Sequence, residues 1–206
     1  TAPTTRSLRG RLSGDRGRVL LAAALTGLGL GTLFTFVVPY ALALGARRVS
    51  GFFLGYTAAA IVVRVGFGSL ADRHGRARVS LAGLLAYAAA VAGAAWLTPV
   101  ALPLVGVALG LTHGVTYPSL NALAVAGVSP TESGSTMTYY FGAYSLGRSL
   151  SVAALGLFAG TAGYPATFLV AGAVLSAGAL VLLPLARAEW RAARALGDAK
   201  RPCPAA

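Results

Sequence analysis

The sequence GSLADRHGRAR, residues 68–78, stands between two uninterrupted apolar runs, and this arrangement decides the fold class. The run before it covers about 52–70, and the run after it covers about 79–97. A helix needs about 20 mainly apolar residues to cross a bilayer. The polar stretch is therefore a predicted connection between two transmembrane helices.

The same pattern extends over the rest of the chain. Apolar residues form 56% of the 206 residues and charged residues 11%, whereas a soluble domain carries about 25% charged residues. The apolar runs are continuous instead of alternating, so they predict helices and not a β-barrel. We expect an all-α membrane protein with six transmembrane helices, at about 19–44, 52–70, 79–97, 100–125, 136–158 and 165–185.

Lysine and arginine are unevenly distributed between the two sides of this predicted bundle. With both termini on one side, thirteen basic residues fall on that side and only Arg47 and Arg48 on the other. Cytoplasmic segments are enriched in Lys and Arg, so we expect both termini in the cytoplasm and the bundle in the inner (plasma) membrane. We therefore attribute the net charge of +12 to the topology of a protein in a lipid bilayer. We do not attribute it to nucleic-acid binding, because the sequence contains no nucleic-acid-binding motif. The predicted organisation is a basic segment (1–17), a six-helix bundle (18–186) and a basic tail (187–206).

A shift of 79 residues aligns the first three predicted helices with the last three. The matches include two prolines, Pro39 with Pro118, and three pairs of glycines, Gly27 with Gly106, Gly31 with Gly110 and Gly68 with Gly147. Three helices are an odd number, so the second copy must run opposite to the first, as in the inverted repeats of secondary transporters. Prolines are tolerated in such helices where neighbours or a cavity satisfy the freed carbonyls. We therefore expect kinks at Pro39 and Pro118.

The connection at 68–78 resembles the cytoplasmic loop signature of the major facilitator superfamily, G-x-L-A-D-R-x-G-R-[RK]. Ala77 departs from it, because a second basic residue is usual there; the matching residues are Gly68, Leu70, Ala71, Asp72, Arg73, Gly75 and Arg76. Residues 110–118 resemble the fourth helix of the same half in bacterial efflux permeases. The resemblance covers about 19–186 and fits the C-terminal six-helix half, because a basic tail follows the sixth run.

This resemblance implies a secondary transporter that moves a small solute by alternating access, in the direction of efflux. The solute would lie between this half and a second six-helix half, which is upstream in the same polypeptide, a partner chain or a second copy. The alternative class is a membrane protein without transport, such as a degenerate half or an assembly subunit. The sequence has no Ser/His/Asp set, metal-ligand spacing or phosphate-binding loop, so we expect neither an enzyme nor a bound metal or cofactor.

The predicted gating residues of the loop are Gly68, Asp72, Arg73, Gly75 and Arg76. Glycine at position 75 permits the positive φ of a tight turn. Asp72 can face a helix N-terminus, where the dipole favours an anion, and the polar residues Ser133, Ser135 and Thr136 mark such an N-terminus in the fifth predicted helix. The resemblance implies that this contact holds one conformation and breaks in the other. The alternative is a basic topogenic loop with a helix cap.

Polar side chains inside the predicted helices are the candidate solute-binding residues, because charges in a bilayer usually face protein or water. They are Arg64, His113, Asn121, Tyr144 and Arg148. Arg148 lies about 18 Å from the inner end of its helix, a depth that favours binding an anion over a structural bond to helix-end carbonyls. Arg64 is close enough to the inner end to snorkel or to gate, and His113 suits proton relay or a fixed interhelical hydrogen bond. No Asp or Glu falls inside a predicted helix, so a coupled proton would need His113, the other half or the solute.

Overall fold

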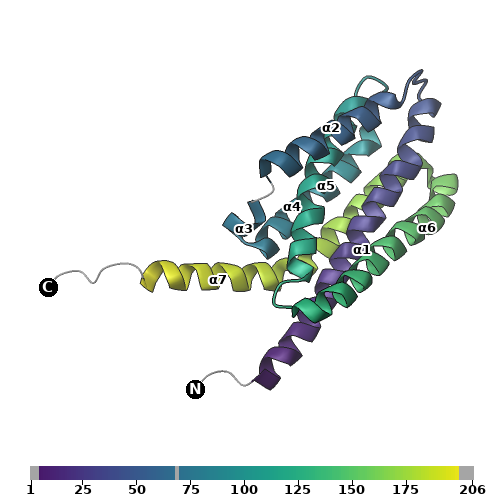
Figure 1. Cartoon of the computed structure of the whole chain (residues 1–206). Coiled ribbons are helices and arrows are strands. Elements are labelled where there is room, and N and C mark those ends of the chain that lie inside the picture. The colour runs from purple at the N-terminus through teal and green to yellow at the C-terminus, as the bar shows by residue number, and fades with distance from the viewer. Residues whose placement is uncertain (1–4, 68–69, 200–206) are drawn as a thin grey trace.

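The computed structural model describes the backbone of residues 5–67 and 70–199, and the side chains of residues 15–66 and 71–195. The described residues are almost entirely helical and contain no strand (Figure 1). Gly68 of the predicted gating loop lies outside them. The elements are α1 (Thr5–Ala43), α2 (Ser50–Phe67), α3 (Leu70–His74), α4 (Arg76–Gly93), α5 (Leu102–Ala124), α6 (Pro130–Ala179), α7 (Leu183–Ala199) and the short 3-10 turns η1 (Ala94–Trp96) and η2 (Leu180–Leu182).

Helix α6 consists of two helical parts that meet at Gly163. This residue has φ 82° and ψ 168°, a conformation that glycine adopts because it lacks a Cβ. Pro165 follows in the first turn of the second part, where its missing N–H costs no helical hydrogen bond. The chain therefore reverses direction within α6, rising in its green part and returning in its yellow-green part (Figure 1). By contrast, α1 and α5 continue through Pro39 and Pro118, where the kinks stay predictions.

Within the described residues, three helical stretches are long and apolar enough to cross a membrane, namely Asp15–Ala43, Arg76–Trp96 and Pro130–Ala195. Ser50–Gly66 is a shorter apolar helix. The all-helical class is confirmed, whereas six spans in two inverted repeats stay a prediction. A uniform shift of 79 residues would place α4 on residues 155–172, which straddle Gly163. The repeat therefore does not extend without a gap through its third helix.

Two long helix pairs form the body of the bundle. Helix α1 packs along α6 and α2 along α5, and α4 contacts both α5 and α6. Glycines set the spacing in both pairs: a Cβ added to Gly147 would collide with the carbonyl group of Ala24, and one added to Gly106 with that of Phe52. Small residues that let backbones approach closely are typical of helix contacts in membranes.

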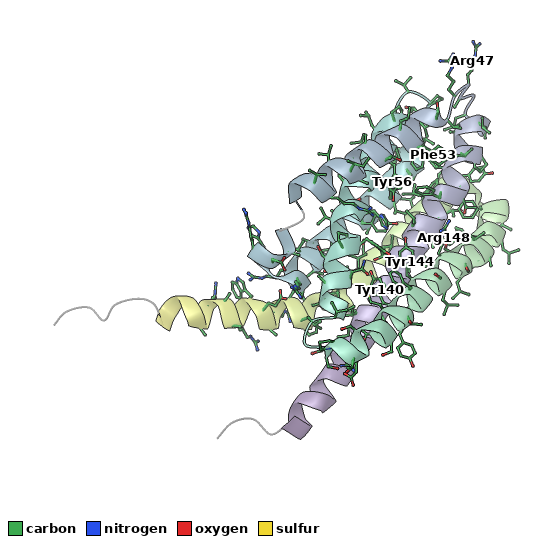
Figure 2. The ribbon with its side chains drawn as sticks, viewed as in Figure 1. Arg47, Phe53, Tyr56, Tyr140, Tyr144 and Arg148 are labelled. Atoms are coloured by element: carbon green, nitrogen blue, oxygen red, sulfur yellow. The ribbon has the colours of Figure 1, made fainter. Side chains whose placement is uncertain are left out.

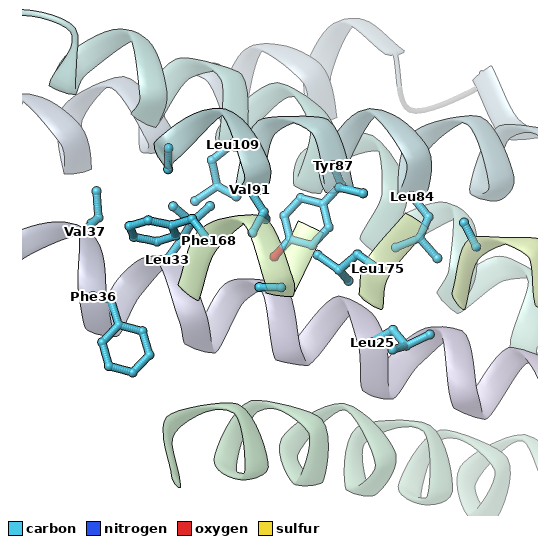
Figure 3. Packing of buried hydrophobic residues seen from close by; sticks show 14 of the residues in the cluster. Leu25, Leu33, Phe36, Val37, Leu84, Tyr87, Val91, Leu109, Phe168 and Leu175 are labelled. Atoms are coloured by element: carbon cyan, nitrogen blue, oxygen red, sulfur yellow. The ribbon is translucent and has the colours of Figure 1, made fainter. Parts of the chain in front are cut away.

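The apolar core lies where α1, α4 and the second part of α6 meet (Figure 3). Its fully buried side chains include Leu33, Val37, Leu84, Tyr87, Val91, Phe168 and Leu175. The hydroxyls of two core tyrosines, Tyr87 and Tyr40, bond to backbone. The hydroxyl of Tyr87 donates to the carbonyl oxygen of Thr26 at 3.2 Å, and that of Tyr40 to the carbonyl oxygen of Ala95 at 3.1 Å. These bonds join α1 to the helix segment that contains α4 and η1.

One end of the bundle gathers the start of α1, the short helix α3 and helix α7 (Figure 1). We call it the basic end, because its described side chains include Arg16, Arg18, Arg73, Arg76, Arg78, Arg187, Arg191 and Arg194. Arg47 lies at the opposite end (Figure 2). The structure adds helix where the sequence predicts tails: residues 5–17 belong to α1, and residues 187–199 belong to α7. The long α1 and the separate α7 therefore extend the bundle at its basic end.

Candidate functional site

A chain of hydrogen bonds through His113 joins three helices in the middle of the bundle. The hydroxyl of Tyr56, on α2, lies 3.2 Å from Nδ1 of His113, on α5. The hydroxyl of Tyr144, on α6, lies 3.3 Å from Nε2 of the same ring. A neutral imidazole has one N–H and one bare nitrogen, so one tyrosine donates to the ring while the other accepts from it. We call Tyr56, His113 and Tyr144 the imidazole bridge.

Aromatic rings enclose this bridge. The ring of Tyr117 lies 5.5 Å from that of His113 between centroids, and the ring of Tyr87 lies 5.7 Å away. Tyr117 also contacts Tyr144 at 5.4 Å and Tyr140 at 6.2 Å. The side chain of His113 is only 4% exposed. The imidazole is therefore held on both nitrogens and on its faces, so the bridge is a preorganised polar group inside apolar surroundings.

The sequence of α5 explains how His113 comes so close to α2. Its helical face toward α2 carries a glycine at every fourth position, Gly106, Gly110 and Gly114. A Cβ at Gly110 would collide with the carbonyl group of Tyr56, and one at Gly114 would touch Ala60 and Val63. Because these positions have no side chain, the backbones of α5 and α2 can approach closely. This approach brings the Tyr56 hydroxyl within hydrogen-bond distance of the imidazole. The Gly-rich pattern therefore positions the bridge as well as packing the helices.

The two arginines inside the predicted spans occupy different places. Arg64, on α2, lines a cavity of about 110 Å³ with Asp72 and Pro118. Arg148, on α6, is exposed beside Ser145 and Ser149. Figure 2 shows Tyr56, Arg148, Tyr144 and Tyr140 following one another along the bundle toward the basic end. Arg148 therefore lies one helical turn from the Tyr144 end of the bridge, and Arg64 lies toward the predicted gate.

Four side chains carry a polar atom that is buried without a hydrogen-bond partner among the described residues, and two of them belong to α5 and α6. These two are Oδ1 of Asn121, a predicted binding residue, and the hydroxyl oxygen of Tyr140. Buried polar atoms are nearly always bonded in native proteins. Asn121 lies two turns after His113 on α5, so α5 carries polar groups along its length toward the basic end.

The predicted gate forms a compact contact around Arg76. Its guanidinium donates to Oδ1 of Asp72, with Nε at 3.2 Å and Nη2 at 3.0 Å, and through Nη1 to the carbonyl oxygen of Ala122 at 3.2 Å. Gly75 has φ 95°, which is the positive φ expected of its turn. The hydroxyls of Ser133 and Ser135 bond within their own helix turn, to Ser129 and Glu132. These contacts join the loop to the end of α5, and Arg76, one helical turn from Asp72, pairs with its carboxylate.

Sequence reasoning missed three features of the structure. Tyr56 is one of the three residues of the bridge, although in the sequence it is only a hydroxyl group in an apolar run. Glu189 accepts hydrogen bonds from the backbone N–H groups of Ala77 at 2.9 Å and Arg78 at 3.2 Å, across more than one hundred residues, so no local signal marks it. A cavity of about 340 Å³ at the basic end is lined by Asp15, Arg16 and Glu132 among mostly apolar residues.

An all-helical bundle with glycine-lined helix contacts, a buried polar bridge and apolar helices of membrane-spanning length has the features of a membrane transport protein. A model of the Major Facilitator Superfamily matches residues 16–205. The chain belongs to the major facilitator superfamily of membrane transporters.

Curated relatives are consistent with this assignment. An uncharacterised MFS-type transporter of Burkholderia mallei (strain SAVP1) is 32% identical over 165 residues, which cover 77% of this chain and 39% of the relative. An uncharacterised MFS-type transporter of Burkholderia pseudomallei (strain K96243) matches with the same identity and coverage. The chain thus spans less than half the length of the curated relatives that it matches.

Proposed function

We propose that this chain is the C-terminal six-helix half of a secondary transporter that moves a small solute by alternating access, in the direction of efflux. Family membership supports transport in general, and the coverage of 39% of each relative fits one half of a longer transporter. The two halves would enclose the solute between them. Both termini of this half would lie in the cytoplasm, as the basic end favours.

The solute site of this half consists of Arg64, His113, Asn121, Tyr144 and Arg148. The single observation that carries this assignment is the imidazole bridge, a side-chain hydrogen-bond chain across α2, α5 and α6. Polar groups at membrane depth are costly and mark substrate pathways. The bridge is anchored at one end beside Arg148, whose side chain is exposed. A solute that approaches Arg148 would meet Tyr144 next, and through it the imidazole.

The charges of this region favour a solute with an anionic group. Arg64 and Arg148 are cationic, and the described carboxylates Asp15, Asp72, Glu132 and Glu189 lie in or near the basic end and not in the middle of the bundle. A guanidinium binds a carboxylate through two parallel hydrogen bonds. The tyrosine rings offer apolar and polar contact together, so a carboxylate attached to an aromatic or apolar body fits the site.

The gate at the basic end is the contact of Arg76 with Asp72 and with the carbonyl oxygen of Ala122. It links the loop before α4 to the last turn of α5, and α5 carries His113. Movement of α5 would therefore strain or release this contact, which couples the solute site to the basic end. Arg73 and Gly75 shape the same loop. The exposed ion pair alone is worth at most about 1 kcal/mol, which suits a contact that breaks in each transport cycle.

Flux measurements on two variants test this proposal. We would reconstitute the full polypeptide that contains this chain in proteoliposomes and measure saturable flux of carboxyfluorescein, an anionic probe, and of ethidium, a cationic one. Arg148→Gln removes a charged hydrogen bond, so carboxyfluorescein flux should fall about tenfold or more. Asp72→Asn should slow the flux of whichever probe is carried while insertion is unchanged.

The Arg47→Gln variant is the matched control, because it removes a charge at the opposite end of the bundle. If the chain belongs to a membrane protein without transport activity, neither probe should show saturable flux. If flux occurs but Arg148→Gln leaves it unaltered, the chain transports and the assigned solute site is wrong.

A further inference from the structure

Helix α7 runs crosswise to the bundle at its basic end (Figure 1). Its start is packed, since Leu182 just before it and Ala186 in its first turn are buried. Beyond that turn the described side chains are exposed, with the exception of the partly buried Glu189. The greater part of α7 therefore leaves the protein core and has faces that the described bundle does not cover.

Glu189 fixes the rotation of α7 about its own axis. Its carboxylate accepts hydrogen bonds from the N–H groups of Ala77 at 2.9 Å and Arg78 at 3.2 Å, at the start of α4. Nε of Arg78 lies 3.9 Å from the same carboxylate. The anion thus meets the positive end of a helix dipole and an arginine together. The Glu189 face of α7 is therefore held toward the bundle.

The remaining faces of α7 are sorted by chemistry. At 3.6 residues per turn, Arg187, Arg191 and Arg194 form a stripe on the face opposite Glu189. One flank consists of alanines, Ala188, Ala192 and Ala195, and the other carries Trp190 and Ala193. These side chains are exposed. Helix α7 is thus amphipathic, with a basic outer face, and with apolar flanks on either side of its anchor.

We propose that α7 lies in the headgroup layer of the membrane and that Arg187, Arg191 and Arg194 bind the phosphates of anionic phospholipids. The helix follows directly on the apolar stretch that ends at η2, so it begins at the membrane boundary. Amphipathic helices with an arginine face and a tryptophan lie in the plane of the interface. Long arginine stems reach outward to headgroups while their methylenes stay with the apolar flank.

The charges and side-chain sizes of α7 favour lipid over a protein partner. Glu189 is the acidic group among the described side chains of α7 and is already bonded to α4, which leaves a stripe of positive charge. A leaflet rich in anionic lipid attracts such a stripe. Protein interfaces are enriched in large aromatic side chains and depleted in alanine, whereas the flanks of α7 are mainly alanine.

Trp190 supplies a second, independent sign of an interfacial position. Its ring is 46% exposed, and the guanidinium carbon of Arg194 lies 3.3 Å from its ring centroid. Tryptophan is enriched at the boundary between hydrocarbon and water. The stacking holds a cation beside the indole at the level where phosphates and acyl chains meet, and it makes Trp190 a reporter of that level.

Lipid-specific quenching of Trp190 tests the proposal. Trp96→Phe, in η1, leaves Trp190 as the sole tryptophan of these 206 residues, and any tryptophan elsewhere in the full polypeptide would be replaced by phenylalanine in the same background. That polypeptide would be placed in nanodiscs of phosphatidylcholine that contain a small fraction of brominated phosphatidylglycerol, or the same fraction of brominated phosphatidylcholine. The ratio of the two quenching efficiencies measures enrichment of anionic lipid around α7.

We expect both brominated lipids to quench Trp190. The ratio of quenching by phosphatidylglycerol to quenching by phosphatidylcholine should be several-fold greater than one. Each arginine contributes up to about a fivefold preference, so Arg191→Gln should lower the ratio and the combined Arg187→Gln, Arg191→Gln and Arg194→Gln variant should bring it to about one. Arg47→Gln with Arg48→Gln is the matched control and should leave the ratio unchanged. All five of these arginines are exposed, so we expect the replacements to leave the fold intact. A monodisperse gel-filtration peak would verify this.

Three results would overturn the proposal. If neither brominated lipid quenches Trp190, this residue lies in water or is covered by another protein. Equal quenching by both lipids removes the anionic preference. A ratio that the triple variant does not lower assigns the preference to other residues. None of these readings depends on solute flux, so they leave the transport proposal untouched.

Discussion

Two pairs of tyrosines in this bundle use their hydroxyls in different ways. Tyr40 and Tyr87 lie on the side where α1 meets the α4–η1 segment, and both donate to backbone carbonyls. Tyr56 and Tyr144 lie around α5, and both bond to the imidazole of His113. The first pair is buried, with at most 9% exposure, and the second is only partly buried.

This difference distinguishes the fixed pair, Tyr40 and Tyr87, from the imidazole bridge, which can switch between two hydrogen-bond arrangements. A carbonyl oxygen only accepts, so the bonds of Tyr40 and Tyr87 have one possible direction and hold two helices together. A neutral imidazole both donates and accepts, so the bridge has two arrangements that differ in which tyrosine donates. A solute that competes for one tyrosine therefore changes the hydrogen bond at the other, on a different helix. We infer that the α1–α4 side is scaffold and that the α2–α5–α6 side responds to solute.

The largest expected effect is on transport when the bridge is removed. His113→Ala deletes two interhelical hydrogen bonds of about 1 kcal/mol each, so flux should fall about tenfold or more. Tyr87→Phe removes a bond of the fixed pair and should leave flux within about twofold of the unmodified protein. The measurement is initial flux of the transported probe in proteoliposomes. Equal losses in the two variants would abolish the distinction between scaffold and switch.

A smaller effect is expected at Tyr140, which belongs to neither pair. Its hydroxyl is buried without a hydrogen-bond partner among the described residues, which costs desolvation energy without return. Tyr140→Phe should therefore stabilise the protein by about 1 kcal/mol, or about 2–4 °C in Tm. Tyr144→Phe is the matched control one turn away, and it should lower Tm instead. Thermal unfolding followed by fluorescence-detected gel filtration measures both, and a fall in Tm for Tyr140→Phe would reveal a partner for this hydroxyl.

The smallest effect concerns the stability that the fixed pair provides. Tyr87→Phe removes the bond to Thr26 at unchanged ring packing. Interhelical bonds of this kind average about 0.6 kcal/mol in membrane proteins, so Tm should fall by about 1–2 °C. The same thermal assay detects this shift, with Tyr139→Phe, which is 69% exposed, as the variant expected to show none. A loss of several degrees would mean that the core side depends on the bond more than its packing suggests.

The sequence was sufficient for the features that depend on local pattern. The apolar runs fall on helices, and the loop with Gly75 adopts the expected positive φ. The break in α6 at Gly163 lies between the apolar runs predicted at 136–158 and 165–185. The loop signature led to the superfamily that the family match confirms. Each of these signals lies within a few residues, where steric rules and helix length are enough to decide.

Features that depend on how helices rotate against one another could not be predicted in this way. His113 and Tyr144 were recognisable separately, but their bond and the role of Tyr56 depend on how closely α5 and α2 approach. The partner of Asp72 was expected at 133–136, yet Arg76 is nearer along the chain. The arginines of α7 are typical of a basic tail, because charged residues interrupt the apolar pattern of this segment, and the orientation of α7 depends on the contact of Glu189 with the distant start of α4.

The bond from Glu189 to the start of α4 has a consequence for biosynthesis. Glu189 and Ala77 are 112 residues apart in the sequence, which a ribosome traverses in about 6–22 s at about 5–20 residues per second. During that interval the first turn of α4 has emerged without its acceptor, so the loop beside it remains uncapped while later helices insert. The start of α4 is capped only after α7 has been synthesised. A chain that stops before residue 189 would lack the carboxylate that accepts hydrogen bonds from Ala77 and Arg78.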